Sequence, residues 1–262
     1  MNKTRTRIKK FIYKTFGEGV YAKAYAKGKV RDINNGVLDE KEAAFLAHFI
    51  QNDSTVLDIG ANYGHYAIDM SRICKNGHVF AFEPVPFTHK VLEKIVAHFG
   101  STNITLNHAA VSDKLGTIEM TVPLLDFGAP NTGVAYVGEQ TETAGKTVKV
   151  KTIAIDELPF SSKIDFIKID IEGHEPHAFK GMKNLLLKDR PVILIEFSHP
   201  CLNRADSKPS EFATYIKNEL SYTFTQVANK SLELVQNETP PDGYYFLIPT
   251  EGLTGFKNLF TS

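Results

Sequence analysis

From Thr55 onward, short apolar runs alternate with longer segments in which apolar residues recur at helical spacing. The apolar runs predict strands at Thr55–Ile59, His78–Phe82, Ile104–His108, Ile164–Ile171, Val192–Phe197, Phe224–Ala228 and Tyr244–Ile248. The amphipathic segments predict helices at Tyr66–Cys74, Phe87–Phe99, Pro176–Leu187 and Pro209–Leu220. Strand segments such as Val192–Ile195 are apolar on both faces, as in a parallel sheet covered by helices on each side. The pattern therefore predicts an α/β, Rossmann-like fold with a mostly parallel, doubly wound sheet of seven strands.

One stretch interrupts the alternation. Thr117–Val122 and Val148–Ile153 show the period of two that is typical of half-buried strands. The loop between them contains four glycines, Gly128, Gly133, Gly138 and Gly145. We therefore expect a β-hairpin insertion over about residues 117–153, with a mobile tip.

Residues 1–50 differ from the rest, and we expect a helical extension there and a single Rossmann-like domain over residues 51–262. Residues 1–17 hold six Lys or Arg and no acid, and Ile8, Phe11, Ile12 and Phe16 recur at helical spacing. This amphipathic helix either packs its apolar stripe on the domain, which is the commoner case, or contacts an anionic membrane surface or a partner. A second helix is expected over residues 39–50.

The composition excludes some classes of protein but does not indicate a function. Of the 262 residues 42% are hydrophobic, and the 30 basic side chains balance the 30 acidic ones, which gives no overall attraction to nucleic acid. Cys74 and Cys201 lie in no metal-binding spacing, and no apolar run is long enough to cross a bilayer. A cytoplasmic protein is the expectation; its oligomeric state cannot be predicted.

The strongest local motif is Val-Leu-Asp-Ile-Gly-Ala-Asn-Tyr-Gly, which begins at Val56. An apolar strand carries Asp58 near its end, and a Gly-x-x-x-Gly turn from Gly60 to Gly64 then opens a helix. Such glycines let the backbone approach a ligand, and the helix N-terminus offers it unpaired N–H groups. A carboxylate here favours a ligand with positive groups, such as the amino and sulfonium groups of S-adenosylmethionine. A pyrophosphate is disfavoured there, and its usual motif is Gly-x-Gly-x-x-Gly.

Two later strands also end in acidic residues. Glu83 ends the strand His78–Phe82, about 20 residues after the glycine turn, where an acid can accept the ribose hydroxyls of a nucleoside. The strand Ile164–Ile171 ends in a dense ionisable cluster of Asp170, Glu172, His174 and Glu175. Ligands bind at the carboxyl ends of strands in open α/β sheets. Buried charges need partners, so stability alone explains this cluster poorly.

Together these motifs resemble the FkbM family of methyltransferases: Val-Leu-Asp-Ile-Gly-Ala-Asn-x-Gly, Phe-Glu-Pro-x-Pro and Lys-Ile-Asp-Ile-Glu-Gly-His-Glu occur in order between residues 55 and 197. The segment Ala110-Val111-Ser112-Asp113 is also similar to the family. The resemblance implies a class I methyltransferase fold, S-adenosylmethionine as cofactor, and O-methylation of a hydroxyl on a sugar, polysaccharide or secondary metabolite. It implies that the cofactor is held by Asp58, Gly60, Ala61, Asn62, Gly64, Glu83, Pro84, Ala110, Val111 and Asp170.

An alcohol acceptor must lose a proton during methyl transfer, which calls for a general base or a metal ion. The candidate bases are His174, Asp170, Glu172, Glu196 and His199, and His174 leads because an ordinary histidine titrates near neutrality. Asp170, Glu172 and Glu196 could instead bind a divalent cation, but their spacing does not require one, and no metal site is assigned. Two alternatives to methyl transfer remain: a non-catalytic interaction module on the same fold, and, less favoured, a nucleotide-dependent oxidoreductase.

Overall fold

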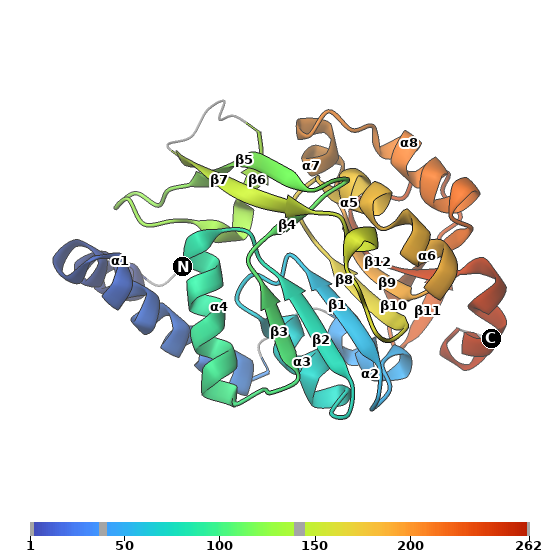
Figure 1. Ribbon diagram of the computed structural model, residues 1–262, viewed down its shortest axis with the longest axis horizontal. Coiled ribbons are helices and arrows are strands. Elements are labelled where there is room, and N and C mark those ends of the chain that lie inside the picture. The colour runs from blue at the N-terminus through green and yellow to red at the C-terminus, as the bar shows by residue number, and fades with distance from the viewer. Residues whose placement is uncertain (1–2, 37–40, 139–144, 261–262) are drawn as a thin grey trace.

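The computed structural model describes residues 3–36, 41–138 and 145–260. A large central sheet lies between layers of helices, and a smaller sheet lies above one end of it (Figure 1). The expected α/β architecture is confirmed. The tip of the predicted insertion, residues 139–144, and the start of the second predicted helix lie outside the described residues.

In the described residues the central sheet has eight strands, in the order β11-β10-β12-β9-β8-β1-β2-β3. They are β1 (Thr55–Ile59), β2 (His78–Phe82), β3 (Ile104–Asn107), β8 (Ile164–Ile169), β9 (Val192–Phe197), β10 (Tyr222–Ala228), β11 (Ser231–Leu234) and β12 (Gly243–Pro249). The five strands from β3 to β9 are parallel, whereas β12 runs antiparallel to β9 and β10. The prediction of seven strands is wrong by one. A tight turn at Asn229-Lys230 adds β11 as an edge strand to β10, and its four residues are too few for the hydrophobic pattern to predict.

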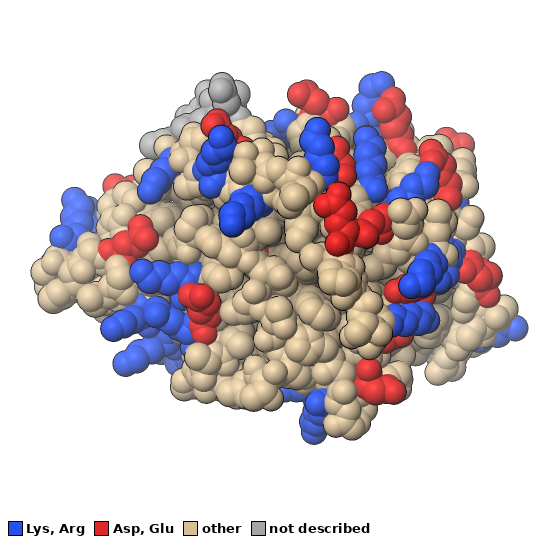
Figure 2. All heavy atoms as spheres, in the orientation of Figure 1, with Lys and Arg blue, Asp and Glu red and all other residues tan. Residues whose placement is uncertain are grey.

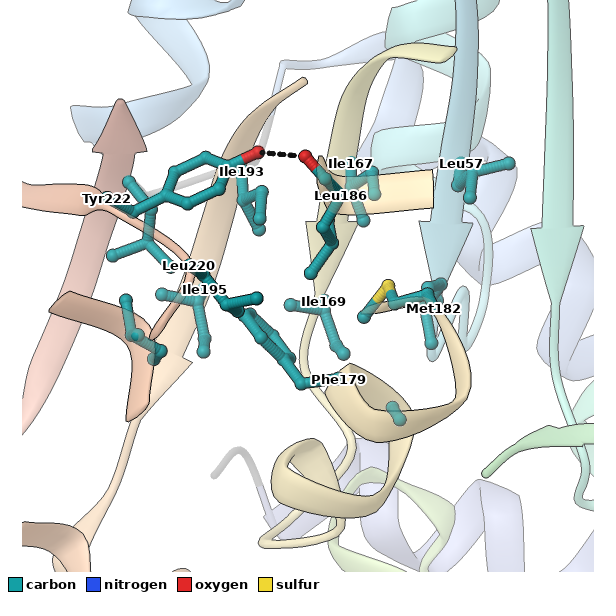
Figure 3. Close-up of a cluster of buried hydrophobic side chains, with 14 of the residues drawn as sticks. Leu57, Ile167, Ile169, Phe179, Met182, Leu186, Ile193, Ile195, Leu220 and Tyr222 are labelled. Atoms are coloured by element: carbon teal, nitrogen blue, oxygen red, sulfur yellow. Dashed lines mark hydrogen bonds between the residues drawn. The ribbon is translucent and has the colours of Figure 1, made fainter. Parts of the chain in front are cut away.

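Helices cover both faces of this sheet: α2 (Leu46–Phe49), α3 (His65–Ile73), α4 (Pro86–Phe99), α5 (Glu175–Gly181), α6 (Lys183–Asp189), α7 (His199–Arg204) and α8 (Pro209–Thr214). On one face, side chains from the strands meet α5 and α6 in a buried cluster that includes Ile169, Ile195, Phe179 and Met182 (Figure 3). On the other face, Phe49 stacks against Phe166. The central strands β1 and β9 thus bury side chains on both of their faces, as the apolar runs in their sequences predict.

Two predicted helices are interrupted. The helix expected at Pro176–Leu187 breaks at Met182 into α5 and α6. There the backbone of Gly181 lies so close to the Ser112 carbonyl that a Cβ atom would be 1.9 Å from the oxygen. The helix expected at Pro209–Leu220 begins as α8 and continues as a π-helix over Tyr215–Glu219.

The predicted hairpin is confirmed as the antiparallel pair β5 (Gly116–Pro123) and β7 (Gly145–Ile153). In the described residues these strands belong to a second sheet of four, in which β4 (Ala110–Val111) pairs with β7 and β6 (Tyr136–Val137) pairs with β5. Because β4 follows directly after β3, this small sheet is fixed beside the carboxyl ends of the central strands (Figure 1).

The N-terminal helix α1 (Lys3–Asn34) is longer than predicted and kinks at Gly17, whose φ is 73°. Its second half packs along α4 (Figure 1), where Tyr21 is 1% exposed and stacks on Phe87. The expectation that the apolar stripe of residues 8–16 packs on the domain is largely wrong. Ile12 contacts the core cluster of Tyr21 and Phe87, but the other three residues of the stripe, Ile8, Phe11 and Phe16, are exposed.

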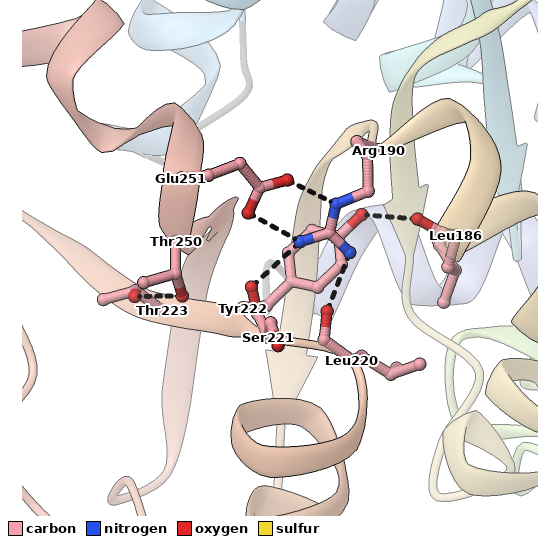
Figure 4. A network of polar contacts seen from close by, with 8 residues as sticks. All are labelled: Leu186, Arg190, Leu220, Ser221, Tyr222, Thr223, Thr250 and Glu251. Atoms are coloured by element: carbon pink, nitrogen blue, oxygen red, sulfur yellow. Dashed lines mark hydrogen bonds and ion pairs between the residues drawn. The ribbon is translucent and has the colours of Figure 1, made fainter.

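An arginine ties the C-terminal region to the central sheet. Arg190 donates from Nε and Nη2 to the two carboxylate oxygens of Glu251, at 2.7 and 3.0 Å, and from Nη1 and Nη2 to the carbonyl oxygens of Leu220 and Ser221 (Figure 4). Its guanidinium also stacks 4.6 Å from the ring centre of Tyr222. These contacts join the loop after α6, the start of β10 and the 3-10 helix Thr250–Leu259.

Candidate active site

A cavity of about 460 Å³ opens at the carboxyl ends of β1, β2 and β8. The chain runs outward from β1 to β3 and then crosses to β8 on the other side of β1, so the cavity lies where the strand order reverses. Open α/β sheets bind their ligands at this point. Of the predicted site residues, Gly60, Ala61, Asn62, Glu83, Pro84, Ala110, Val111, Asp170, Glu172 and His174 line the cavity, whereas Asp58, Gly64 and Glu196 do not.

The turn after β1 is built from backbone conformations that suit glycine. Gly60 has a φ of +80°, and a Cβ atom on it would lie 2.0 Å from the carbonyl oxygen of Asp170. Gly64 has a φ of +75°, and a Cβ atom on it would meet the side chain of Leu92. Asn62, between them, also has a positive φ, of 48°, and its buried Oδ1 has no hydrogen-bond partner among the described residues. The turn thus presents an unused acceptor at the cavity wall.

Glu83 joins this turn to the end of β2. Its Oε2 accepts a hydrogen bond from the backbone N–H of Asn62 at 2.9 Å, and its Oε1 accepts one from Val85 at 2.8 Å. The side chain is 5% exposed, and this burial raises the pKa of Glu83 to about 7 despite the two hydrogen bonds. Each oxygen keeps a lone pair, so the carboxylate can accept further hydrogen bonds from a ligand.

Asp58 lies behind the cavity wall rather than on it. It is fully buried, and burial raises its pKa to about 6. The ammonium group of Lys168 and the backbone N–H of Ala67 partly offset this by favouring the charged form. Lys168 is itself 5% exposed and lines the cavity, where its Nζ lies 3.4 Å from the Gly60 carbonyl and 3.5 Å from Asp170 Oδ2. A buried cation therefore stands among three carboxylates, those of Asp58, Glu83 and Asp170.

Asp170 lines the cavity, and its side chain is 25% exposed. It follows β8, and its Oδ2 accepts a hydrogen bond from the Tyr244 hydroxyl at 3.3 Å in addition to the contact with Lys168. Glu196 lies beside it on β9. Burial, the charge of Asp170 and a hydrogen bond shared with Asp170 together raise the pKa of Glu196 well above its ordinary value. This shift favours the protonated form of Glu196.

Two of the other three candidate bases, Glu172 and His174, are engaged by neighbouring side chains. Glu172 pairs with Arg204 at 3.3 Å and accepts a hydrogen bond from the Cys201 thiol. His174 caps the start of α5, is 7% exposed, and has its Nε2 2.9 Å from the Ser112 hydroxyl. Burial and the neighbouring His177 lower the pKa of His174 to about 4, so the ring is neutral at pH 7 but is a weak base.

His199, the last candidate, points away from this group. Its Nε2 lies 2.7 Å from the Pro240 carbonyl, and it does not line the cavity.

Sequence reasoning missed part of the wall. Tyr25 and Lys29 reach the cavity from α1, where they lie beside His65 of α3. Lys29 is half-buried with its Nζ 5.0 Å from the ring centre of Tyr63, and burial lowers its pKa. No motif marks these two residues, because only the packing of α1 along α4 brings them to the site. Lys168 is part of the motif Lys-Ile-Asp-Ile-Glu-Gly-His-Glu. A lysine within an otherwise apolar strand could have marked it as a residue of the site.

Among the described residues, no group of three His, Cys, Asp or Glu side chains is placed to hold a metal ion. Glu172 forms an ion pair with Arg204 at 3.3 Å.

The wall fits S-adenosylmethionine. The close-packed glycine turn, the unused Asn62 Oδ1 and the lone pairs of Glu83 supply a backbone cradle and acceptors for an amino group and for ribose hydroxyls. The acidic surroundings suit a ligand with an ammonium and a sulfonium group. A volume of 460 Å³ also lies within the range of small-ligand sites.

The strand order, with β12 inserted antiparallel, together with this site, defines the α/β methyltransferase fold. The model of the methyltransferase FkbM domain matches residues 58–224, and the chain belongs to this family. The resemblance read from the sequence motifs is thereby confirmed.

Three relatives show how far the similarity extends. Hexuronic acid methyltransferase AglP of Haloferax volcanii is 30% identical over 170 residues, which cover 63% of this chain and 64% of AglP. Methyltransferase 1 of Beauveria bassiana is 23% identical over 183 residues, 62% of this chain and 71% of that protein. The crystal structure of methyltransferase FkbM from Methylobacillus flagellatus matches with a TM-score of 0.50 and 16% identity, over 75% of this chain and 44% of that chain, and shows the shared fold alone.

Proposed function

We propose that this protein is an S-adenosylmethionine-dependent O-methyltransferase that acts on a sugar hydroxyl. The main support for the proposal is that the glycine turn, Glu83 and Asp170 line one cavity at the carboxyl ends of three strands. Family membership supports the reaction, and the name of the relative AglP, a hexuronic acid methyltransferase, supports a sugar as acceptor.

The cofactor would lie across this wall. Glu83 would accept the ribose hydroxyls, and Asn62 Oδ1 would accept from the amino group of the methionine part. Lys29 would face the α-carboxylate from α1, because it is the cation that lines the cavity beside the turn residue Tyr63. Ala110 and Val111 would border the adenine with apolar surface. Asp58 would act from behind the wall through its charge.

S-adenosylmethionine, when bound, supplies an electrophilic methyl group, which the acceptor oxygen takes while sulfur keeps the electron pair of the broken bond. The protein must align the acceptor and receive its proton. We assign the role of general base, which takes the proton of the acceptor hydroxyl, to Asp170. The sequence had favoured His174 for this role. Asp170 reaches the cavity, and Lys168 and Tyr244 fix its orientation. His174 is bonded through Nε2 to the Ser112 hydroxyl and is 7% exposed, so it is less accessible to an acceptor than Asp170, whose side chain is 25% exposed.

Transfer of a radiolabelled methyl group from S-adenosylmethionine to a panel of uronic acids and neutral sugars tests the proposal. Asp170→Asn should lower the rate about 10²- to 10⁴-fold, the usual contribution of a general base. Glu196→Gln should retain most activity, because Gln mimics the protonated form that Glu196 already favours. His174→Asn is the matched control and should lose less than Asp170→Asn. The assignment is wrong if His174→Asn loses activity and Asp170→Asn keeps it. Failure to methylate any sugar hydroxyl would contradict the acceptor class.

A further inference from the structure

The first half of α1 and the residues just after its kink carry exposed apolar side chains that the domain does not cover. Ile8 is 55% exposed, Phe11 63%, Phe16 56% and Val20 45%. These four are half of the eight large exposed hydrophobic side chains in the described part of the chain. The rings of Phe11 and Phe16 contact each other at a centroid distance of 6.1 Å, so these two side chains form one apolar patch.

Other side chains of the same part of the helix contact the rest of the protein. Tyr13 contacts the rings of Tyr21 and Phe127 at 5.3 and 6.1 Å, and Lys9 lies 4.7 Å from the ring centre of Tyr25. The exposed face is therefore held in one orientation on the surface of the folded molecule.

Cations flank this face. Arg7, Lys10 and Lys14 are exposed, and the first acidic residue of the chain is Glu18, beyond the kink at Gly17. Lys and Arg side chains gather over α1 at the left of the molecule (Figure 2). An amphipathic helix with aromatic residues on one face and cations beside them is the kind that lies in the interface of an anionic bilayer. None of the described helices is long and apolar enough to cross a membrane.

We propose that residues 7–20 dock this protein on an anionic membrane surface. Phe11, Phe16, Ile8 and Val20 enter the interfacial region, while the flanking cations contact the lipid headgroups. The positive charge beside the apolar side chains favours an anionic membrane over a second copy of the chain. In a dimer formed through this helix, the cations of the two copies would repel each other. The same helix carries Tyr25 and Lys29 to the cavity, so docking fixes the cavity relative to the membrane. This inference is independent of the proposed reaction.

Sedimentation of the full chain with vesicles tests the proposal. We expect binding to phosphatidylcholine vesicles that contain phosphatidylglycerol, little binding to pure phosphatidylcholine vesicles, and release as salt is raised. The variant Phe11→Ser/Phe16→Ser should bind at least tenfold more weakly, and so should Lys10→Glu/Lys14→Glu. The matched control is Leu115→Ser, which removes an apolar side chain that is 69% exposed elsewhere and should leave binding unchanged.

All the substituted side chains are exposed, so thermal unfolding should report intact folding in each variant. Absence of binding to the anionic vesicles, or equal binding by both double variants and the wild type, would overturn the proposal. So would an oligomer of the wild-type chain that Phe11→Ser/Phe16→Ser dissociates, because the face would then join two copies.

Discussion

The Glu83 carboxyl links cofactor affinity to pH. Its pKa of about 7 in the ligand-free protein means that it takes up a proton as the pH falls below neutrality. Ribose hydroxyls donate to the charged form, so affinity for S-adenosylhomocysteine should fall below pH 7, by up to about tenfold for each unit. Titration calorimetry at several pH values measures this. Glu83→Gln should bind weakly and show a flatter pH profile; an unchanged profile would mean that another group causes the dependence.

A substitution at Lys29 can distinguish the loss of a charge contact with the cofactor from a loss of local structure. Lys29→Met keeps the apolar stem but removes the charge that would face the α-carboxylate of the cofactor. It should weaken S-adenosylhomocysteine about tenfold or more, since a hydrogen bond to a charged group contributes about 1.5–3 kcal/mol. The affinity for 5′-methylthioadenosine, which lacks the amino-acid part, should change little. Equal weakening of both ligands would instead indicate a loss of local structure.

At the scale of elements, the turn between β1 and α3 depends on close backbone approach. Gly60→Ala would place a Cβ atom 2.0 Å from the Asp170 carbonyl at a φ of +80°, which displaces the turn from β8. We expect loss of S-adenosylhomocysteine binding and a lower midpoint of thermal unfolding. Gly100→Ala is the matched control, because Gly100 has a φ of +63° but open space around it. It should lose only about 1 kcal/mol of stability and keep full binding. If both variants lost binding and stability to a similar extent, the positive φ, and not the close approach to Asp170, would be the cause.

The elements also show what the sequence could predict. The strands β1, β2, β8 and β9 and the acids at their ends were predictable, because burial on both faces and local glycine chemistry leave a mark within a few residues. The break at Met182 and the edge strand β11 were not predictable, because contacts with distant backbone or very short pairing create them. The roles of Tyr25 and Lys29 depend on how α1 packs on α4, which no local pattern records.

At the scale of the whole molecule, Arg190 holds the C-terminal region and does not line the cavity. Arg190→Met should lower the free energy of unfolding by about 1–3 kcal/mol, because it removes charge-assisted hydrogen bonds to Glu251 and to two carbonyl groups. Glu251→Gln should cost less than about 1 kcal/mol, because Glu251 is largely exposed. Urea unfolding measures both, and S-adenosylhomocysteine binding should be unchanged in each. A larger cost for Glu251→Gln than for Arg190→Met would contradict this account.

The central claim is that the cavity binds S-adenosylmethionine, and calorimetric titration with S-adenosylhomocysteine, run in parallel with NADH, tests it most directly. We predict saturable binding of S-adenosylhomocysteine at one site per chain, no binding of NADH, and a higher midpoint of thermal unfolding in the bound protein. Binding of NADH alone would contradict the claim and indicate a nucleotide-dependent oxidoreductase, and binding of neither ligand would favour a non-catalytic use of the fold.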